Sequence, residues 1–329
     1  MNMKQCPVCA SPRTSSGAGC PVCDFPFAFV ETFASPAAKR RWEEEADRLR
    51  MNRRAAQAVV RSGFAILEGQ AACIENGVLR RFGVSEIADT PNAVQISQSR
   101  THTLILLADG SVIAEGSNRM GQCMVQNIKN AAFVLAGPNV SYIVTRDGNV
   151  RICGVSPVAQ EVSEWRDISA LACGDYFVAG LTREGRVRIA AAGPEVFSPQ
   201  PEWNNIQAIA AGADYLMALD KNGRVLLAGS AGDERCGSVA RWENIAAIAA
   251  EDMYAVALGK DGRVLIAGEG GWLDRGRSEA GNWTNMTAIA AGHGAIAAVD
   301  ESGRLRIAGS LFATAAGREA IIAQWGKQR

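Results

Sequence analysis

The chain has 329 residues, 48% of them hydrophobic, which is enough for two domains or for one large domain with an extension. Its 34 basic and 34 acidic residues give a formal net charge of zero, which argues against a protein whose main role is to coat nucleic acid. The N-terminal MNMKQCPVC lacks the apolar segment of a secretory signal, and no apolar stretch is long enough to cross a membrane. With an odd count of nine cysteines, these features predict a protein of the reducing cytoplasm.

Residues 6–23 read CPVCASPRTSSGAGCPVC, two Cys-x2-Cys pairs separated by ten residues. Four thiolates at this spacing can close a tetrahedral site, so the sequence predicts one structural Zn²⁺ in a zinc ribbon over residues 1–30, held by Cys6, Cys9, Cys20 and Cys23. The repeated CPVC resembles the small zinc ribbons at the N-termini of many bacterial proteins. Two roles stay open for the zinc ribbon. The metal either only stabilises a segment too small to fold alone, or the ribbon also binds protein or nucleic acid. The other five cysteines are interpreted as small core residues.

A helix is expected within residues 31–61, with Ser35 as its N-cap and Pro36 as its first residue, because neither Gly nor Pro follows until Gly63. Its narrow apolar stripe would pack on the following domain or on a second copy. Its six arginines between 40 and 54 could contact phosphates or an acidic partner. Glu and Asp at 43–45 and 47 alternate with them, which favours a solvated face instead.

From residue 62 onward the chain repeats with a period of about 38 residues. Each of seven units has a turn in which a glycine follows Asp, Asn, Glu or Ser between two apolar runs, the signal of a β-hairpin. The seven glycines are Gly77, Gly110, Gly148, Gly185, Gly223, Gly262 and Gly303. In most units a second glycine follows six residues later, and the later units open with Trp165, Trp203, Trp242 and Trp283.

Runs such as YLMALD and RVLLAG are too short and too closely bounded by glycine for helices, so each unit is expected to form three or four short strands. A single small sheet cannot bury both faces, but seven sheets arranged radially can. The predicted fold is therefore all-β: a seven-bladed β-propeller over residues 62–329, preceded by the zinc ribbon and one helix. An open β-solenoid is the alternative. The C-terminal IIAQW is expected to supply the outer strand of the last blade.

These phased residues resemble the repeats of the regulator of chromosome condensation family of propellers. WNNIQAIAAG at 203–212 and DGRVLIAG at 261–268 match the two halves of the family's repeat, and GSNRMGQ at 116–122 is similar to its G-x-N-x-x-G-Q stretch. The compact loops look more like the bacterial members. The resemblance implies a rigid disc that binds another protein, but the family's functions differ from one member to the next.

No catalytic set is recognised, so the chain is predicted not to be an enzyme and to have no small-molecule substrate. His102 is in phase with Tyr215 and Tyr254 and is interpreted as a packed residue of its blade. His293 is out of phase and is expected in a surface turn. There is no G-x-S-x-G elbow and no Walker-type loop.

Two classes of loop are candidates for binding a protein partner. The first joins the AIAAG-type strand to the next strand, and its residues vary between units while the surrounding strands stay constant. Its candidate residues are Asn139, Asp175, Tyr176, Asp214, Met253 and His293. The second is the long link between Gly268 and Trp283, where Trp272 lies beside Arg275 and Arg277, a composition typical of interface hot spots. Alternatively, Trp272 covers the edge of a blade.

The sequence thus predicts a cytoplasmic, non-enzymatic binding module that acts as an adaptor, inhibitor or regulator of another protein. One alternative is regulation of a nucleotide-binding protein, as an exchange factor does. Another is nucleic-acid binding through the zinc ribbon and the Arg-rich helix, which would depend steeply on salt.

Overall fold

The computed structural model describes residues 64–67, 70–75, 77–83, 89–193, 202–229, 237–251, 254–268, 276–292, 294–309 and 315–327. All of them belong to one compact unit, Ala56–Arg329. The predicted zinc ribbon and the predicted helix within residues 31–61 lie outside the described residues.

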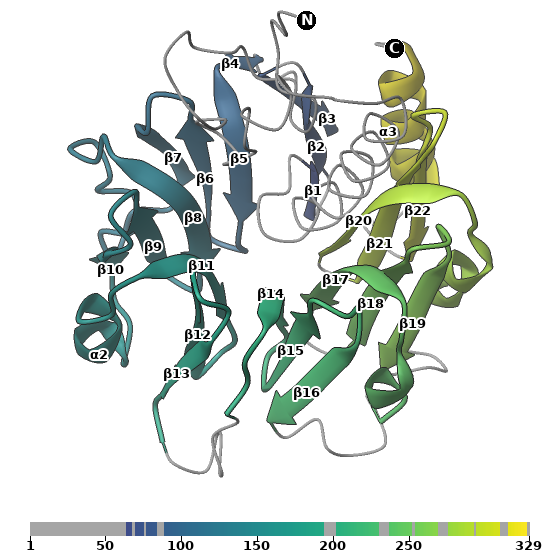
Figure 1. Ribbon diagram of the computed structural model, residues 1–329. Helices are drawn as coiled ribbons and strands as arrows, with labels where there is room; N and C mark the ends of the chain where they lie inside the picture. The colour runs from purple at the N-terminus through teal and green to yellow at the C-terminus, as the bar shows by residue number, and fades with distance from the viewer. Residues whose placement is uncertain are drawn as a thin grey trace, which may run out of the picture. The chain divides into compact units, whose positions relative to one another are not determined.

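The described residues form seven antiparallel sheets, numbered here as blades 1 to 7 in chain order (Figure 1). Blade 1 contains β1 (Phe64–Leu67), β2 (Gln70–Glu75), β3 (Val78–Gly83) and the short β4 (Thr90–Pro91). Blade 2 contains β5 (Ala93–Gln98), β6 (His102–Leu107) and β7 (Val112–Gly116). Blade 3 contains β8 (Ala131–Gly137), β9 (Val140–Thr145) and β10 (Val150–Gly154). Blade 4 contains β11 (Ile168–Cys173), β12 (Phe177–Thr182) and β13 (Val187–Ala191). Blade 5 contains β14 (Ile206–Ala211), β15 (Tyr215–Asp220) and β16 (Val225–Gly229). Blade 6 contains β17 (Ile245–Glu251), β18 (Tyr254–Gly259) and β19 (Val264–Gly268). Blade 7 contains β20 (Met286–Gly292), β21 (Ala295–Asp300) and β22 (Leu305–Gly309).

The blades form a closed ring. The first strands of the blades, β1, β5, β8, β11, β14, β17 and β20, contact one another in chain order, and β20 contacts β1. Figure 1 shows these strands around the centre, with the later strands of each blade further out. The predicted seven-bladed propeller is therefore confirmed, and blade 7 closes the ring against blade 1.

Burial explains why the middle strands read as unbroken apolar runs. β9, β12, β15 and β18 are buried at every position, because each middle strand has neighbouring blades on both of its faces. A strand that is half exposed would instead alternate apolar and polar residues. The run YLMALD of β15 is thus a strand buried on both sides rather than part of a helix.

The predicted turns are present, and they also join neighbouring blades. All seven turn glycines have positive φ, between 76° and 88°, a conformation that glycine adopts without steric cost. The carbonyl of Gly148 in blade 3 accepts a hydrogen bond of 3.0 Å from the backbone N–H of Ile168, the first residue of blade 4. The same glycine-to-next-blade bond occurs at Gly77, Gly110, Gly185, Gly223 and Gly262.

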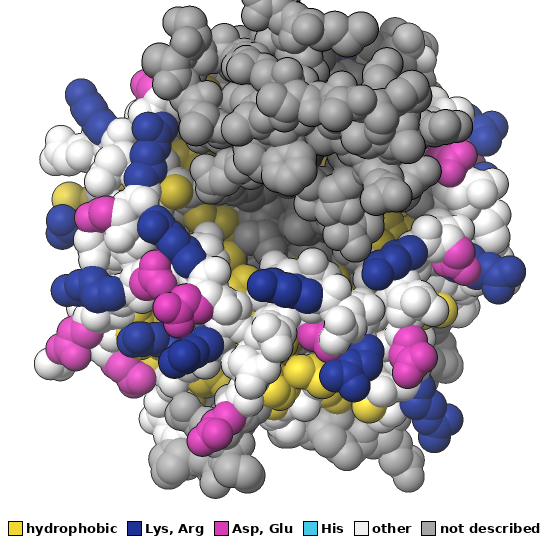
Figure 2. Space-filling model, viewed as in Figure 1, with side chains coloured by type: hydrophobic (Ala, Val, Ile, Leu, Met, Phe, Trp, Pro, Cys, Tyr) yellow, Lys and Arg dark blue, Asp and Glu magenta, His cyan; other side chains and the backbone are white. Residues whose placement is uncertain are grey.

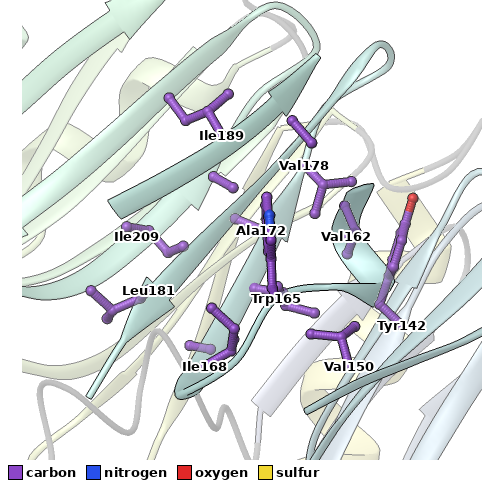
Figure 3. Close-up of a cluster of buried hydrophobic side chains, with 14 of the residues drawn as sticks. Tyr142, Val150, Val162, Trp165, Ile168, Ala172, Val178, Leu181, Ile189 and Ile209 are labelled. Atoms are coloured by element: carbon purple, nitrogen blue, oxygen red, sulfur yellow. The ribbon is translucent and has the colours of Figure 1, made fainter. Parts of the chain in front are cut away.

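Tryptophans in phase with the repeat fill the gaps between blades. Trp165 is 4% exposed and lies among apolar side chains of blades 3 and 4, as Figure 3 shows for Val150 and Ile168. Its indole packs over Gly180 of β12, where an added Cβ would lie 2.6 Å from the ring. Because Gly180 has no side chain, it leaves room in this otherwise apolar strand for the tryptophan of the same blade.

The expectation that IIAQW supplies the outer strand of the last blade is wrong. These residues belong to the helix α3 (Ala315–Lys327), which packs against β22 of blade 7 and β3 of blade 1. Ile321 and Trp325 are four residues apart, so they lie on one side of a helix, and both are buried. A strand would place these two side chains on the same face only together with Ala323, which is exposed here.

Three other short helices are described: α2 (Ala159–Ser163) and the 3₁₀ segments η3 (Val239–Arg241) and η5 (Arg277–Asn282). They lie in the links between blades and contact the outer strands β10, β16 and β19, respectively. In the part of the chain that the structure describes, no helix has the length and apolar content to span a bilayer.

Candidate protein-binding face

The turns between the first and middle strands of the blades gather at one end of the ring, which we call the mouth face. There the turns of blades 2 to 5, with the ends of β17 and β20, line a cavity of about 420 Å³. Behind it, a second cavity of about 220 Å³ is lined by the first strands of all seven blades and forms the central channel. The glycine turns between the middle and outer strands lie at the opposite end, because an antiparallel strand order places successive turns at alternate ends of the blade.

Backbone hydrogen bonds hold the turns of the mouth face in place. Asp175 N–H donates to the carbonyl of Ala213 in the next blade at 2.8 Å. Ala192 N–H donates to the Tyr176 carbonyl at 2.8 Å, and Val155 N–H donates to the Asn139 carbonyl at 3.2 Å. Asn139 has a φ of 58°, which its short amide side chain tolerates. The backbone is thus fixed while these side chains face outward.

The structure brings four of the predicted partner-binding residues together on this face. Asn139 and Asp175 are exposed and line the mouth cavity. Tyr176 follows Asp175 in the same turn with 62% of its surface exposed. Asp214 is half-buried in the turn of blade 5, next to Ala213 of the cavity wall. Met253, His293, Trp272 and Arg275 lie outside the described residues, as do the zinc-ligand candidates Cys6, Cys9, Cys20 and Cys23.

Arg277, one of the predicted partner-binding residues, is packed within the ring rather than exposed. Arg277 is 6% exposed at the start of η5, and its guanidinium lies over the Tyr254 ring, 4.4 Å from the ring centroid. Its stem also packs on Gly309 of β22, where an added Cβ would lie 2.7 Å from Arg277 Cγ. The contact is of the cation–π type and joins blades 6 and 7, so this arginine packs the ring rather than facing a partner.

Two charged residues of the mouth were missed from the sequence. Arg100 is exposed in the turn of blade 2, and Glu251 is half-buried at the end of β17; both line the mouth cavity. Arg100 falls in Ser99-Arg100-Thr101, the same position in its unit as Pro138-Asn139 in the next one. Aligning the turn of this earlier unit with the later ones would have found it.

Burial shifts the pKa of two titratable side chains of the blades, Cys173 and His102. Burial, reinforced by the Asp175 carboxylate, raises the pKa of the Cys173 thiol to about 12, so the thiol stays protonated at neutral pH. Burial also lowers the pKa of His102, whose Nε2 lies 2.8 Å from Ser141 Oγ of the next blade. His102 is 3% exposed, which confirms its interpretation as a packed residue of its blade.

The cysteines of the described residues differ in their burial. Cys73 and Cys123 are buried, as expected of small core residues, whereas Cys153 and Cys173 are half-buried. In the described ranges no three His, Cys, Asp or Glu side chains form a group that could hold a metal ion.

Charges of both signs are spread over the described part of the face shown in Figure 2. Figure 2 shows basic and acidic side chains interspersed around the visible part of the ring, with hydrophobic side chains among them. On this face, the described residues show no continuous basic stripe of the kind that tracks a nucleic-acid backbone.

The comparison with solved structures shows the fold of this chain. No protein-family model matches the chain, and no curated protein matches it. Among solved structures, the CRINKLY WD40 ectodomain of the receptor kinase ACR4 from Arabidopsis thaliana is 15% identical, with a TM-score of 0.61 over 77% of this chain and 96% of that one. The ectodomain of the receptor kinase CR4 from Physcomitrella patens is 16% identical, with a TM-score of 0.60 over 76% and 73% of the two chains.

Prp20p from Saccharomyces cerevisiae, also described as yeast RCC1, is 17% identical to this chain, with a TM-score of 0.53 over 66% of this chain and 72% of that one. At such identities the likeness shows a β-propeller and nothing finer.

Proposed function

We propose that the chain is a non-enzymatic module that binds another protein on its mouth face. The observation that supports this most directly is that the turns of blades 2 to 5 line one cavity of about 420 Å³. These turns differ in sequence between blades, whereas the strands that hold them keep one pattern. Exposed side chains on a rigid scaffold are typical recognition sites.

The composition of the turns fits a protein partner. Tyr176 presents a large ring with few rotatable bonds, so it loses little conformational freedom when it is buried in an interface. Asp175 and Arg100 add opposite charges on the same cavity, which can fix the orientation of a partner. The solved propeller Prp20p is described as binding Gsp1p and histones, and in another structure it is bound to Kap60.

The test is affinity capture from the source cells with the full chain, with nuclease present throughout. The double variant Asp175→Ala/Tyr176→Ala should lose a stoichiometric protein partner. The matched control Glu184→Ala/Lys221→Ala removes two exposed side chains from turns of the opposite end and should retain it. Equal capture by both double variants would overturn the assignment to the mouth face.

Regulation of a nucleotide-binding protein is the second candidate, supported by the likeness to yeast RCC1 in fold. Its test is the rate at which the captured partner releases a bound nucleotide, with and without the chain. An accelerated release that is lost in Asp175→Ala/Tyr176→Ala would favour this function over simple binding.

Nucleic-acid binding through residues 1–62 is a third candidate, and it rests on the sequence alone. It predicts that retention of nucleic acid falls steeply with salt and disappears when these residues are removed. If residues 63–329 alone still retain a partner after nuclease treatment, nucleic-acid binding is excluded as the main function.

A further inference from the structure

An exposed apolar patch lies where blades 2 and 3 meet on the mouth face. Met120 is 53% exposed, Met124 is 65% exposed and Val155 is 62% exposed. Among the described residues only three other large apolar side chains are exposed, and one of these, Tyr176, is on the same face. Large apolar side chains that gather on one surface mark interaction sites more often than scattered ones do.

Hydrogen bonds connect the patch to the mouth. Cys153 Sγ donates to the Met124 carbonyl at 3.2 Å, so the blade 2 loop lies against the end of β10. Val155 comes two residues later, and its N–H donates to the carbonyl of Asn139, which lines the mouth cavity. These bonds place the patch next to the turn of Asn139, which lines the mouth cavity.

The loop that carries the two methionines is held rigidly. Asn118 Oδ1 accepts from Cys123 N–H at 2.9 Å, and Gln122 Oε1 accepts from Met120 N–H at 2.9 Å. Ser141 Oγ of blade 3 donates to the Gln122 carbonyl at 2.7 Å. A backbone fixed in this way presents flexible methionine side chains without having to order itself on binding.

Two arginines border the patch. Arg100 and Arg119 are both exposed, and neither forms an ion pair with any residue that the structure describes. Ser117 N–H donates to the Thr101 carbonyl at 2.9 Å, which places the turn of Arg100 beside the loop of Arg119. Glu115, four residues before Arg119 in the chain, is paired with Arg81 at 3.1 Å.

We propose that this surface, made of Arg100, Arg119, Met120, Met124 and Val155, binds a protein segment with acidic and bulky apolar side chains. The apolar side chains of the segment cover the two methionines and Val155, and its carboxylates pair with the arginines. The inference rests on the proposed function and adds the chemistry of the partner. Two arginines beside three apolar side chains fit such a segment better than a phosphate backbone, which calls for a longer basic track.

The test uses the full chain and two synthetic peptides, measured by fluorescence anisotropy. One peptide alternates Asp or Glu with Leu or Phe, and the second has Lys in place of every acid. The acidic peptide should bind with an affinity that falls with salt, and the basic peptide should not. Arg100→Glu/Arg119→Glu should weaken binding of the acidic peptide about tenfold or more, because like charges then face each other.

Matched variants separate charge from packing. Lys221→Glu/Lys260→Glu makes the same change of charge in exposed turns at the opposite end and should leave peptide binding unchanged. Met124→Ser should weaken binding severalfold without changing its salt dependence, since it removes only apolar contact. Equal binding of the two peptides, or equal loss in both double charge variants, would overturn the inference.

A single-stranded oligonucleotide serves as a third probe. If it binds more tightly than the acidic peptide and competes for Arg100 and Arg119, the surface is a nucleic-acid site and the inference fails. The proposed function is tested separately: a captured partner that depends on Tyr176 but not on Arg100 and Arg119 would leave it standing while this inference falls.

Discussion

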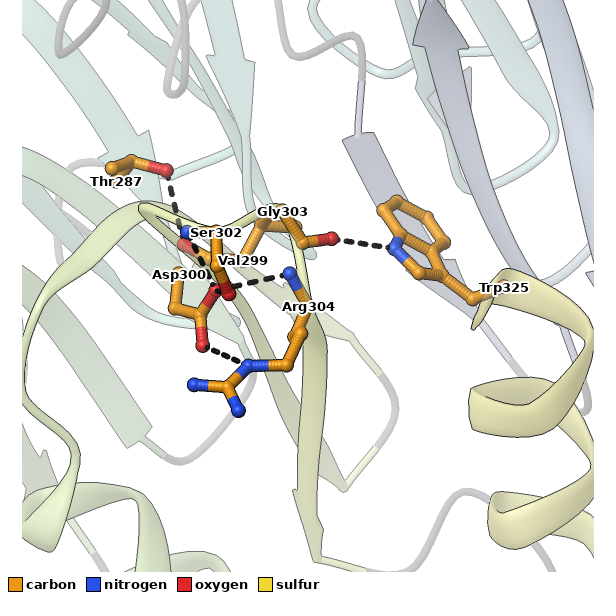
Figure 4. Close-up of polar contacts among 7 residues, drawn as sticks. All are labelled: Thr287, Val299, Asp300, Ser302, Gly303, Arg304 and Trp325. Carbon is orange, nitrogen blue, oxygen red and sulfur yellow. Dashed lines mark hydrogen bonds and ion pairs between the residues drawn. The ribbon is translucent and has the colours of Figure 1, made fainter. Parts of the chain in front are cut away.

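The indole N–H of Trp325 donates a 2.9 Å hydrogen bond to the backbone carbonyl of Gly303 (Figure 4). Gly303 is the turn glycine of blade 7. At the six other turn glycines, the carbonyl accepts from the backbone N–H of the residue that begins the next blade. At the junction of blades 7 and 1, a side chain of α3 takes that place.

The same tryptophan also contacts blade 1. Its ring centroid lies 5.8 Å from that of Phe64 in an edge-to-face arrangement and 4.9 Å from that of Phe82. The neighbouring Gln324 Oε1 accepts from Gly83 N–H at 3.0 Å. The helix α3 is therefore a clasp between the last blade and the first.

Trp325→Ala should open this clasp. The side chain is 3% exposed, so its removal leaves a cavity between blades 7 and 1 and should lower the free energy of unfolding by about 3–5 kcal/mol. Trp325→Phe keeps an aromatic ring but lacks the donor to Gly303, and it should cost less. Urea unfolding followed by circular dichroism measures both.

The control for that prediction is Ile322→Ala, three positions earlier in α3, where the side chain is 36% exposed. It should change stability by much less. A Trp325→Ala variant as stable as Ile322→Ala would show that α3 does not hold the ring closed.

Turn glycines should differ in their tolerance of alanine. Gly148 has a φ of 82°, and an added Cβ would lie 2.8 Å from Asp167 Cα in the next blade. Gly77 has a φ of 76° with nothing within 4 Å of an added Cβ. Gly77→Ala should therefore cost about 1–2 kcal/mol from backbone strain alone, and Gly148→Ala should cost more. Equal losses of unfolding free energy in the two variants, measured by urea unfolding, would mean that the contact between blades does not add to the cost of Gly148→Ala.

Acid should weaken blade 7 through Asp300, which is buried with its side chain 5% exposed. Burial raises the pKa of this carboxyl, but hydrogen bonds from Ser302 and Arg304 outweigh it and lower the pKa to about 2, from an ordinary 3.8. Because the pKa is lower in the folded state, the stabilisation is present above the ordinary value and is lost as pH falls from about 4 to about 2.

Asp300→Asn should therefore flatten the fall of unfolding free energy between about pH 4 and pH 2. Ser302→Ala removes one donor, a 2.6 Å bond from Ser302 Oγ to Asp300 Oδ1, and should give an intermediate slope. Urea titrations at several pH values measure the slope. An unchanged slope in Asp300→Asn would mean that other carboxyls account for the acid sensitivity.

Only substitution of the N-terminal cysteines should remove the predicted zinc. The full chain should contain one zinc ion, and Cys6→Ser/Cys9→Ser should contain none, since two thiolates are too few for a closed tetrahedral site. Cys153→Ser, a half-buried cysteine of β10, should keep the metal. Metal analysis by mass spectrometry decides the matter, and zinc retained by the double variant would contradict the ligand assignment.

Local features of the sequence determined the number and strand order of the blades. A glycine with positive φ between two apolar runs makes a hairpin wherever it occurs, and seven such turns in phase left a ring of seven sheets as the natural arrangement. Buried middle strands such as Tyr215–Asp220 likewise follow from continuous apolar runs. These features depend on residues close together in the chain.

Contacts between distant residues decided the rest. The repeat ends before residue 315, so nothing periodic indicated that Trp325 would reach Gly303 and Phe82, or that Gln324 would bond Gly83, 241 residues away. The composition around Arg277 was typical of an interface hot spot, yet in the tertiary fold its guanidinium lies over the ring of Tyr254 and the residue is buried. The turns of the mouth face, by contrast, meet around one cavity only because the ring closes, and closure is a property of all seven blades together.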